Sequence, residues 1–239
     1  MVDLSKMDKK ALGKLFDHAI LPKETTEKDI RDGCKEAIKY NCAAVYSSSP
    51  YFTPVIVEEL KGTDILIGCG IGFPFGCQPS AVKAFETRYA VKAGCTVVDM
   101  VMNIGALKNK DYDVVRQELK DFKEAAGKAI TKVILEVCYL KNDEIEMGAK
   151  LVAEAGIMYC KTSTGQFEGP SMQQFLVMKK ALEGTGVRLK VSGVKFPRPQ
   201  NAYAFIMAGA ELIGTRSAPE IIDGFEMCQE IGIIPKTSK

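Results

Sequence analysis

The sequence predicts an α/β fold, a single (β/α)8 TIM barrel that occupies residues 1–239 as one domain. Three observations predict it. Runs of β-branched and apolar residues recur along the whole chain, each run is followed by a helical pattern, and successive runs begin roughly 22 to 35 residues apart. Eight such units in about 250 residues are typical of this barrel, and no linker is long enough to divide the chain.

The eight expected strands are short runs, and each is bounded by polar residues, Gly or Pro. In chain order they are Asp17–Leu21, Cys42–Ser47, Asp64–Ile71, Thr96–Val101, Lys132–Val137, Ile157–Lys161, Val187–Val191 and Glu211–Gly214. Three junctions between a helix and the next strand are marked directly by an Ala-Gly pair, which begins at Ala93, Ala155 and Ala208.

The helices are expected between these strands because each intervening segment starts with Ser, Thr, Asp, Asn or Pro and then shows helical periodicity. They are Thr26–Lys39, Pro50–Lys61, Pro79–Ala93, Asp111–Ala126, Asn142–Ala155, Ser171–Leu182, Pro199–Ala208 and Ala218–Phe225. Several end at a glycine, which favours a left-handed cap. Those glycines are Gly62, Gly94, Gly156, Gly184 and Gly209.

A doubly wound open sheet is the alternative with the same alternation of strands and helices. It would need a glycine-rich dinucleotide-binding turn. The glycine cluster at Gly68, Gly70 and Gly72 lacks the third glycine at the required spacing. The sequence therefore favours the closed barrel.

Charge and hydropathy exclude several classes of partner. The chain has 32 Lys+Arg against 30 Asp+Glu, a net charge of +2, which predicts neither nucleic-acid nor membrane binding. The first ten residues lack the apolar core of a signal peptide. The weakly polar run Ile65–Cys77 is interrupted by glycines and a proline and is too short for a bilayer span. We therefore expect a soluble, cytoplasmic protein.

The cysteine and histidine content argues against a metal site. None of the eight cysteines forms a CxxC pair, so zinc-ribbon and redox-dithiol sites lack their spacing. Scattered free thiols suit a reducing compartment. His18 is the only histidine, which excludes a site built from several histidines. His18 is one residue out of phase with Asp17, so we expect a hydrogen-bonded structural role for it. We expect no metal and no cofactor.

Charged residues within the expected strands are the candidates for catalysis. Three consecutive strands carry Lys132, Lys161 and Lys190, while Asp99 and Asp17 lie in two other strands. Side-chain alternation places Lys161 on the face of Ile157 and Tyr159, and Lys132 on the face of Ile134 and Glu136. Neighbouring strands are about 4.8 Å apart, so the lysines can approach one another inside the barrel.

Crowded, desolvated lysines disfavour their own charged forms. A lysine whose pKa falls in this way is a nucleophile that can form a Schiff base with a carbonyl. The two aspartates would balance charge and pass protons. A single strand lysine would more simply lie at an edge, in solvent or in a salt bridge. Three on consecutive strands together with two acids favour the buried cluster, although this reasoning does not choose which lysine attacks.

Short polar loops after the last three strands predict a phosphate site. Thr164 and Gly165 end the segment Thr-Ser-Thr-Gly, Ser192 and Gly193 come after strand seven, and Gly214 and Thr215 come after strand eight. Backbone amides and hydroxyls of such loops bind phosphate, and the loops after strands seven and eight are the usual phosphate position in this fold. Each loop alone is a weak signal. Together they predict a phosphorylated substrate.

A series of motifs in chain order resembles the 2-deoxyribose-5-phosphate aldolase family, over roughly residues 11 to 225. The motifs are FDHAIL, GIGFPFG, KAFE, VVDMVMNIGALK, KVILEV, AGIMYCKTSTG, LKVSG and IGTRS. The resemblance implies a metal-free class I aldolase on a TIM barrel, with Lys161 as the Schiff-base lysine. It further implies that Lys190 lowers the pKa of Lys161 and relays protons, that Asp99 is a proton donor and acceptor, and that Asp17 and Lys132 support the relay.

The chain departs from the family pattern at the substrate end. Val194 replaces the second glycine after strand seven, Arg216 replaces a small residue after strand eight, and Gln166 stands where a Phe is usual. No tyrosine follows Tyr203, whereas some family members carry a carboxyl-terminal one. We expect Arg216 to line the substrate-binding site and supply charge to a phosphate, unless it points outward as a surface residue. Lys195 or Arg198 in the strand-seven loop would assist it.

The expected reaction is the reversible cleavage of 2-deoxy-D-ribose 5-phosphate to acetaldehyde and D-glyceraldehyde 3-phosphate. One alternative is a paralogous class I aldolase for another sugar phosphate. Another is a non-catalytic barrel that binds a sugar phosphate. We expect the chain to form a homodimer or a higher homo-oligomer, while the direction of flux stays open.

Overall fold

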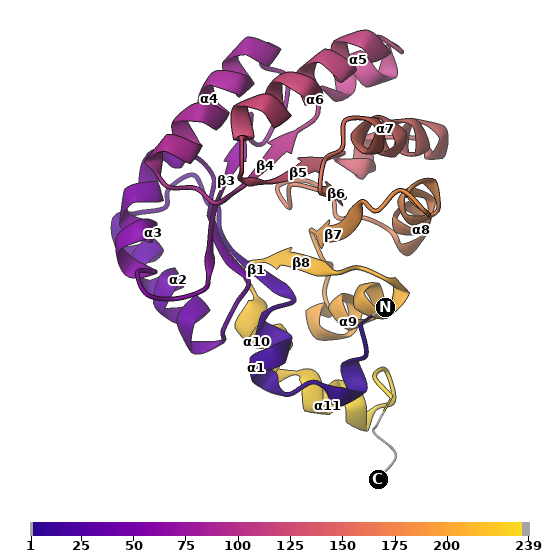
Figure 1. The fold of residues 1–239 in the computed structure, drawn as a ribbon. Helices are drawn as coiled ribbons and strands as arrows, with labels where there is room; N and C mark the ends of the chain where they lie inside the picture. Colours follow the sequence, from indigo (N-terminus) through magenta and orange to yellow (C-terminus); the bar gives the residue numbers. More distant parts are fainter. Residues whose placement is uncertain (1, 236–239) are drawn as a thin grey trace.

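Eight parallel strands close into a barrel in chain order, from β1 to β8 and back to β1, in the computed structural model, which describes residues 2–235 (Figure 1). The strands are β1 (Phe16–Ile20), β2 (Ala44–Ser47), β3 (Leu66–Ile71), β4 (Val97–Val101), β5 (Ile130–Ile134), β6 (Tyr159–Lys161), β7 (Arg188–Ser192) and β8 (Leu212–Thr215). The predicted TIM barrel is therefore confirmed. Of the single domain expected over 1–239, residues 1 and 236–239 lie outside the described part.

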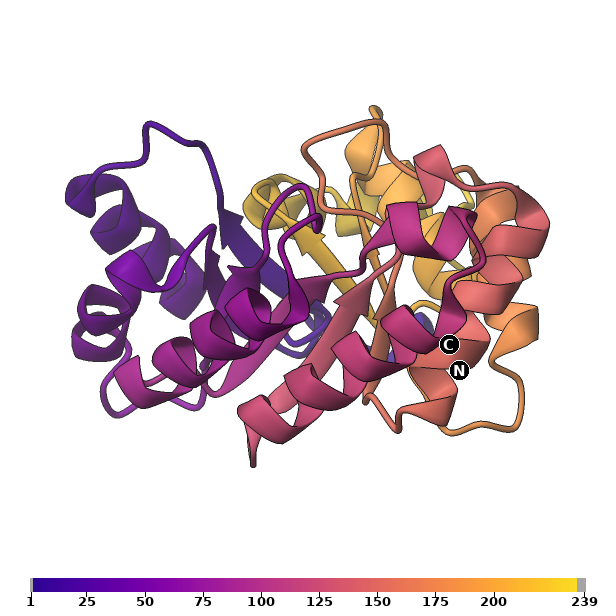
Figure 2. The ribbon, with the colours of Figure 1, turned by 90° about the horizontal axis from the view of Figure 1, so that it is seen from above.

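Helices surround the strands on the outside of the barrel (Figures 1 and 2). The longer ones are α2 (Glu27–Lys39), α3 (Thr53–Glu59), α4 (Ser80–Ala93), α6 (Tyr112–Ala126), α7 (Asn142–Glu154), α8 (Met172–Ala181) and α9 (Arg198–Ala208). The shorter ones are η1 (Leu4–Lys6), α1 (Lys9–Gly13), η2 (Pro50–Phe52), α5 (Ile104–Lys108), η3 (Val137–Tyr139), α10 (Ala218–Asp223) and α11 (Phe225–Glu230). Packing of α1 against α10 brings the beginning of the chain next to its last helices.

Local sequence signals explain where the helices begin and end. Thr26 starts α2 with a capping box, in which its side chain accepts from the Asp29 backbone and the Asp29 carboxylate accepts from Thr26. Ser171 does the same for α8. At the other end, Gly94 terminates α4 with φ of 118° and Gly209 terminates α9 with φ of 116°. Only glycine adopts this conformation without strain.

The apolar core lies between the strands and the helices, not inside the barrel. Outward-facing strand residues such as Val45, Val98 and Val133 are fully buried against the helices. The barrel interior holds a small apolar layer around Ala44 and Val97. Above that layer, towards the carboxyl ends of the strands, the inward-facing side chains are charged. The fold thus places charged side chains in the part of the barrel interior that lies at the carboxyl ends of the strands.

The structure corrects several expected boundaries. The strand expected over Lys132–Val137 runs from Ile130 to Ile134, because Glu136 adopts a left-handed conformation with φ of 52° and a 3-10 turn follows. The expectation that Glu136 shares a strand face with Lys132 is therefore wrong. The helix expected over Pro50–Lys61 is a 3-10 turn followed by α3. The one expected over Ala218–Phe225 divides at Gly224 into α10 and α11.

Candidate active site

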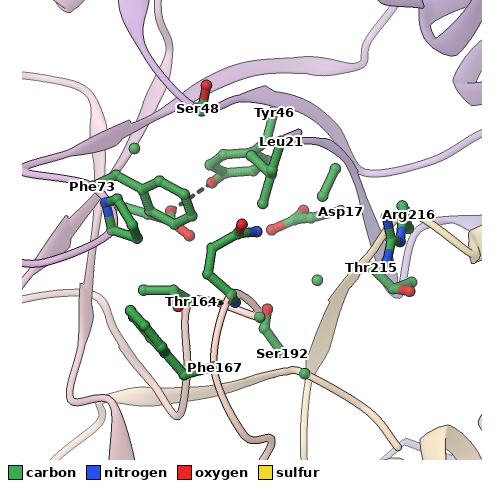
Figure 3. A pocket seen from close by; sticks show the side chains of 18 of the residues that line it. Asp17, Leu21, Tyr46, Ser48, Phe73, Thr164, Phe167, Ser192, Thr215 and Arg216 are labelled. Carbon is green, nitrogen blue, oxygen red and sulfur yellow. Dashed lines mark hydrogen bonds between the residues drawn. The ribbon is translucent and has the colours of Figure 1, made fainter. Parts of the chain in front are cut away.

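A cavity of about 970 Å³ opens at the carboxyl ends of the strands (Figure 3). Its lining includes four of the five predicted catalytic residues: Asp17, Asp99, Lys161 and Lys190. The fifth, Lys132, does not line it. All five side chains are buried, with exposed fractions of 5% for Lys161 and 1% for each of the others. The expected crowding of charged groups inside the barrel is present.

Lys161 ends β6 and points towards β4. Its Nζ lies 2.9 Å from Asp99 Oδ2, to which it donates a hydrogen bond. The neighbouring strand carries Lys190, which is the register partner of Lys161. Lys190 Nζ donates to the same Asp99 oxygen at 2.7 Å. One carboxylate oxygen therefore accepts hydrogen bonds from both lysines and holds them side by side.

Asp17 forms the second half of the cluster. Its Oδ2 lies 2.7 Å from Lys132 Nζ and 2.7 Å from Lys190 Nζ. Lys190 thus bridges the two aspartates, while Lys132 contacts Asp17. The other oxygen, Asp17 Oδ1, is buried and has no hydrogen-bond partner within residues 2–235. Asp17 as a residue lines the cavity, although this oxygen itself is buried.

The balance of charge determines which lysine loses its proton. Three lysines face two aspartates, so the fully ionised cluster carries one excess positive charge. Burial, assisted by the charges of Lys190 and Lys132 and opposed by Asp99, lowers the pKa of Lys161 to about 8. Burial also lowers the pKa of Lys132, but that amine has no access to the cavity. Lys161 is therefore the amine that can be both neutral and accessible.

The other members of the cluster stay charged. Burial disfavours the ammonium of Lys190, but the two aspartates outweigh it and raise its pKa. Burial likewise disfavours the carboxylate of Asp99, yet Lys161 and Lys190 hold its pKa well below the usual range. Asp17 has a lowered pKa for the same reason, with burial outweighed by Lys132 and Lys190. A neutral Lys161 would thus lie beside a fixed anion, Asp99, which also holds the fixed cation of Lys190.

Tyr46 on β2 is a further member of the site that the sequence analysis missed. Its hydroxyl donates to Asp99 Oδ1 at 2.7 Å, the dashed line that starts at Tyr46 in Figure 3. Both oxygens of Asp99 therefore accept hydrogen bonds. Its ring lies 4.2 Å from Lys190 Nζ, measured to the centroid. Gly68 on the next strand makes room, because a Cβ there would lie 2.6 Å from the ring. A signal existed in the sequence, namely a large polar aromatic residue opposite a glycine-rich strand.

Glu136 is a second missed residue. Its buried carboxylate accepts hydrogen bonds from the Thr164 backbone amide, at 3.1 Å to one oxygen and 3.3 Å to the other. Burial raises its pKa, although Thr164 and the charge of Lys161 act in the opposite direction. The left-handed backbone of Glu136 aims the side chain at the loop that follows Lys161. Nothing in the local sequence pattern indicates that turn.

All seven predicted substrate-binding residues line the cavity. They are Thr164, Gly165, Ser192, Gly193, Gly214, Thr215 and Arg216. The loops after β6 and β7 approach each other closely, since Gly193 has φ of 75° and a Cβ there would lie 2.9 Å from the Gly169 Cα. The β8 loop lies across the cavity from Phe73 and Phe167 (Figure 3). The structure therefore brings the predicted loops together around one space.

The cations at the rim differ in their pairing. Lys195 Nζ lies 2.7 Å from Glu168, and Arg198 lies 3.4 Å from Glu220. Arg216 is exposed and lines the cavity, and within the described chain it has neither a hydrogen bond nor an ion pair. Arg216 is thus the guanidinium at this rim that an anionic ligand could engage without displacing a partner.

His18 lies outside the cluster, as its phase predicted. It is buried, and its Nε2 is 3.1 Å from Glu36 on α2. In residues 2–235, no group of three or more His, Cys, Asp or Glu side chains is arranged to hold a metal ion. Nor is any helix in that part of the chain both long and apolar enough to cross a membrane.

Comparisons with known proteins agree on one family. A family model described as DeoC/LacD family aldolase matches residues 12–198. A deoxyribose-phosphate aldolase from Clostridium novyi (strain NT) is 41% identical over 214 residues, which cover 89% of this chain and 96% of that protein.

Solved structures give the same result. A Coccidioides immitis protein, provisionally assigned as a deoxyribose-phosphate aldolase, superposes with a TM-score of 0.87 at 32% identity, over 92% of this chain and 87% of that one. The deoxyribose phosphate aldolase from Aeropyrum pernix, described as tetrameric, has a TM-score of 0.83 at 26% identity, over 92% of each chain.

Proposed function

We propose a specific activity from the premise that the chain belongs to the DeoC/LacD family of aldolases. In this proposal the protein is a class I aldolase, a lyase that cleaves 2-deoxy-D-ribose 5-phosphate reversibly to acetaldehyde and D-glyceraldehyde 3-phosphate. The observation that carries the proposal is the buried Lys161 amine, whose pKa is lowered to about 8 and which lines the cavity beside Lys190 on a shared carboxylate, Asp99. Relatives named for this substrate, such as the Clostridium novyi protein, support its identity.

The reaction begins at Lys161. In the cleavage direction its neutral Nζ attacks C1 of the open-chain sugar and, after loss of water, forms an iminium. Removal of the C3 hydroxyl proton breaks the C2–C3 bond and releases D-glyceraldehyde 3-phosphate, which leaves an enamine on Lys161. Protonation of the enamine carbon and hydrolysis of the resulting iminium release acetaldehyde and regenerate the amine. The iminium acts as the electron sink.

The neighbouring charges move the protons. Lys190 stays protonated because both aspartates contact it, so it is the donor in our scheme. Asp99 stays ionised and accepts hydrogen bonds from both lysines and Tyr46, so it orients Lys161 and receives protons through water. Asp17 helps to keep Lys190 protonated, and Lys132 in turn keeps Asp17 ionised.

The phosphate lies, in this proposal, at the loops after β6, β7 and β8. Backbone amides of Gly165 and Gly193 and the hydroxyls of Thr164 and Ser192 are suited to its oxygens. Arg216 adds a charge that can form a bidentate pair. We assign these residues to substrate binding together with Gly214 and Thr215, which line the same wall.

The test is direct turnover of 2-deoxy-D-ribose 5-phosphate, with acetaldehyde and D-glyceraldehyde 3-phosphate both quantified. The unmodified protein should release the two products in equal amounts. Lys161→Arg should abolish release, because a guanidinium cannot form the iminium. Lys92→Arg, an exposed substitution on α4, serves as the matched control and should leave turnover unchanged.

The alternatives give different outcomes in the same assay. Val194, Gln166 and Arg216 favour an altered acceptor, so a protein that cleaves another sugar phosphate through Lys161 but leaves this one intact would be the paralogous aldolase. A protein that binds sugar phosphates without cleaving any of them would be a binding barrel, and the proposed activity would be wrong.

We extend the proposal to assembly and location. The tetramer described for the Aeropyrum pernix relative supports a homodimer or higher homo-oligomer for this chain, which light scattering of the purified protein would measure. Eight cysteines, all free and six of them buried, suit the reducing cytoplasm.

A further inference from the structure

An aromatic wall closes one side of the cavity. Phe73 and Phe75 come from the β3 loop and Phe167 from the β6 loop, and all three line the cavity. The Phe75 and Phe167 rings lie 6.0 Å apart between centroids, and Tyr139 from the β5 turn packs edge-on against Phe167 at 5.5 Å. Phe75 is 66% exposed and Tyr139 50% exposed. Side chains from three separate loops therefore form one apolar surface at the mouth of the site.

The β3 loop that carries this wall is held in place by a buried network. The amide of Gly76 donates to the Gly72 carbonyl at 2.8 Å, which closes the loop on itself. Lys83 on α4 donates to the Gly76 carbonyl at 2.6 Å, and Glu86 accepts from the Gly72 amide at 2.7 Å. Gly76 packs so closely on the end of β4 that a Cβ there would lie 2.6 Å from the Met102 carbonyl oxygen. The wall is therefore preorganised.

The wall begins next to the reacting amine. The Phe73 ring lies against Gly70, where a Cβ would come within 2.8 Å of the ring, and Gly70 is the register partner of Asp99. Figure 3 shows Phe73 and Phe167 on one side of the cavity and Thr215 with Arg216 on the other. The space above Lys161 thus has an apolar side and a cationic side, which face each other.

In the proposed function the phosphate occupies the cationic side. The three phenyl rings offer its charged oxygens no hydrogen bonds, whereas solvent-facing apolar surface in a groove is typical of a binding site for an apolar group. Each buried ring would contribute through the removal of apolar area from water, and a second ring can add edge-to-face contact. The occupant has to reach the enamine on Lys161 and carry its apolar group towards Phe75.

We propose that the aromatic wall is a second acceptor subsite, which lets the protein add acetaldehyde to unphosphorylated aldehydes that carry a phenyl group. The inference rests on the proposed aldolase function. The enamine carbon on Lys161 attacks the aldehyde carbon of 3-phenylpropanal, and a carbon–carbon bond forms while the carbonyl oxygen takes a proton and becomes a hydroxyl. Water then hydrolyses the iminium, which releases 3-hydroxy-5-phenylpentanal and the free amine. No oxidant or further reactant is required.

The test compares three acceptors with acetaldehyde as donor: 3-phenylpropanal, propanal and D-glyceraldehyde 3-phosphate. The native protein should show a kcat/KM for 3-phenylpropanal about tenfold or more above that for propanal, since the two differ only by the ring. Phe75→Ala combined with Phe167→Ala should lower the value for 3-phenylpropanal about tenfold and leave that for the phosphorylated acceptor within about twofold.

Phe85 provides the matched control. It is 64% exposed on α4, close to the 66% of Phe75, but it does not line the cavity. Phe85→Ala should change neither reaction. No preference for the phenyl aldehyde in a protein that cleaves 2-deoxy-D-ribose 5-phosphate, or an equal loss on all acceptors in the double variant, would overturn the subsite alone. Failure to cleave any sugar phosphate or to add acetaldehyde to any aldehyde would overturn the aldolase function with it.

Discussion

At the scale of single residues, the site depends on one carboxylate shared between two lysines. Asp99 Oδ2 contacts both Lys161 and Lys190, so each amine senses the charge of the other at close range. Of the two, Lys190 has the additional contact with Asp17 and keeps its proton. The lowered pKa of Lys161 therefore depends on Lys190 as well as on burial.

This dependence predicts the behaviour of Lys190→Met. Without the Lys190 ammonium, Lys161 is the remaining lysine on Asp99, and the repulsion between the two ammonium groups is lost. Both changes raise the pKa of Lys161 above about 8. Less neutral amine is then present at neutral pH, and the proton donor is lost. We expect kcat to fall about a hundredfold while KM changes about threefold or less.

The pH profile distinguishes this effect from simple disruption. In the native protein, the rate of Schiff-base formation should rise with pH up to about 8, where Lys161 becomes neutral. In Lys190→Met that rise should move to higher pH. A variant whose profile keeps its position while kcat and KM change together would show that Lys190 has only a packing role.

Arg216 tests the phosphate side at the same scale. Val194 has a Cβ that restricts backbone approach to a phosphate, and Arg216 is an unpaired guanidinium on the facing β8 loop. Arg216→Ala should lower kcat/KM for 2-deoxy-D-ribose 5-phosphate at least about tenfold, or roughly 1.4 kcal/mol of transition-state binding. Cleavage of unphosphorylated 2-deoxyribose should hardly change. Arg88→Ala, an exposed α4 variant, should affect neither substrate. Equal losses on both substrates would refute the assignment.

At the scale of elements, a buried ion pair joins helices α4 and α6 at the carboxyl end of β4. Lys83 on α4 contacts Glu118 on α6 and also donates to the Val101 carbonyl at 2.8 Å, while Glu118 accepts from the Asn103 amide at 2.9 Å. Both side chains are at least 97% buried. The pair therefore connects two helices to the carboxyl end of β4, next to the strand position of Asp99.

Breaking this pair should be costly. Lys83→Met leaves a buried carboxylate without its cation and two carbonyls without a donor, and we expect a loss of about 3 kcal/mol or more in the free energy of unfolding. The double variant Lys83→Met with Glu118→Leu should lose less than the two single losses combined, because neither charge is then left uncompensated. Urea unfolding measures all three. Full additivity would mean that the two groups are not coupled.

The sequence predicted the elements better than it predicted their ends. The periodicity of apolar residues and the helix-capping residues between them located all eight strands. However, β5 ends three residues before the expected Val137, because Glu136 adopts a left-handed conformation and its carboxylate accepts from the Thr164 amide. That turn depends on a contact with the loop after β6, so the local strand propensity does not predict it. The helical periodicity over Ala218–Phe225 also did not predict the break at Gly224 between α10 and α11.

The candidate site was likewise predicted only in part. The alternation of side chains along each strand predicted that Lys132, Lys161 and Lys190 lie inside the barrel, since every second side chain of a barrel strand faces inward. Tyr46 was missed because an apolar strand residue with one hydroxyl resembles core packing until its partner, Asp99, is located. The aromatic wall was missed because Phe75, Phe167 and Tyr139 are far apart in sequence and meet only where their loops converge.

At the scale of the whole molecule, the barrel separates stability from chemistry. The apolar core lies outside the strands, and the charged cluster lies inside them at their carboxyl ends. The upper interior can therefore hold three lysines and two aspartates, because each ammonium has a carboxylate within 3 Å. All three lysines contribute to this arrangement, but Lys161 alone among them should become covalently attached to substrate.

Borohydride trapping with acetaldehyde tests this claim most directly. Reduction of the iminium should add a two-carbon group to one lysine and block trypsin there. Digestion should then yield a fragment spanning residues 151–179 in place of the separate fragments 151–161 and 162–179. Lys161→Arg should show no adduct at any lysine of the cluster. An adduct on Lys190 in the native protein, or none after reduction with either acetaldehyde or 2-deoxy-D-ribose 5-phosphate, would contradict the assignment of Lys161 as the Schiff-base lysine.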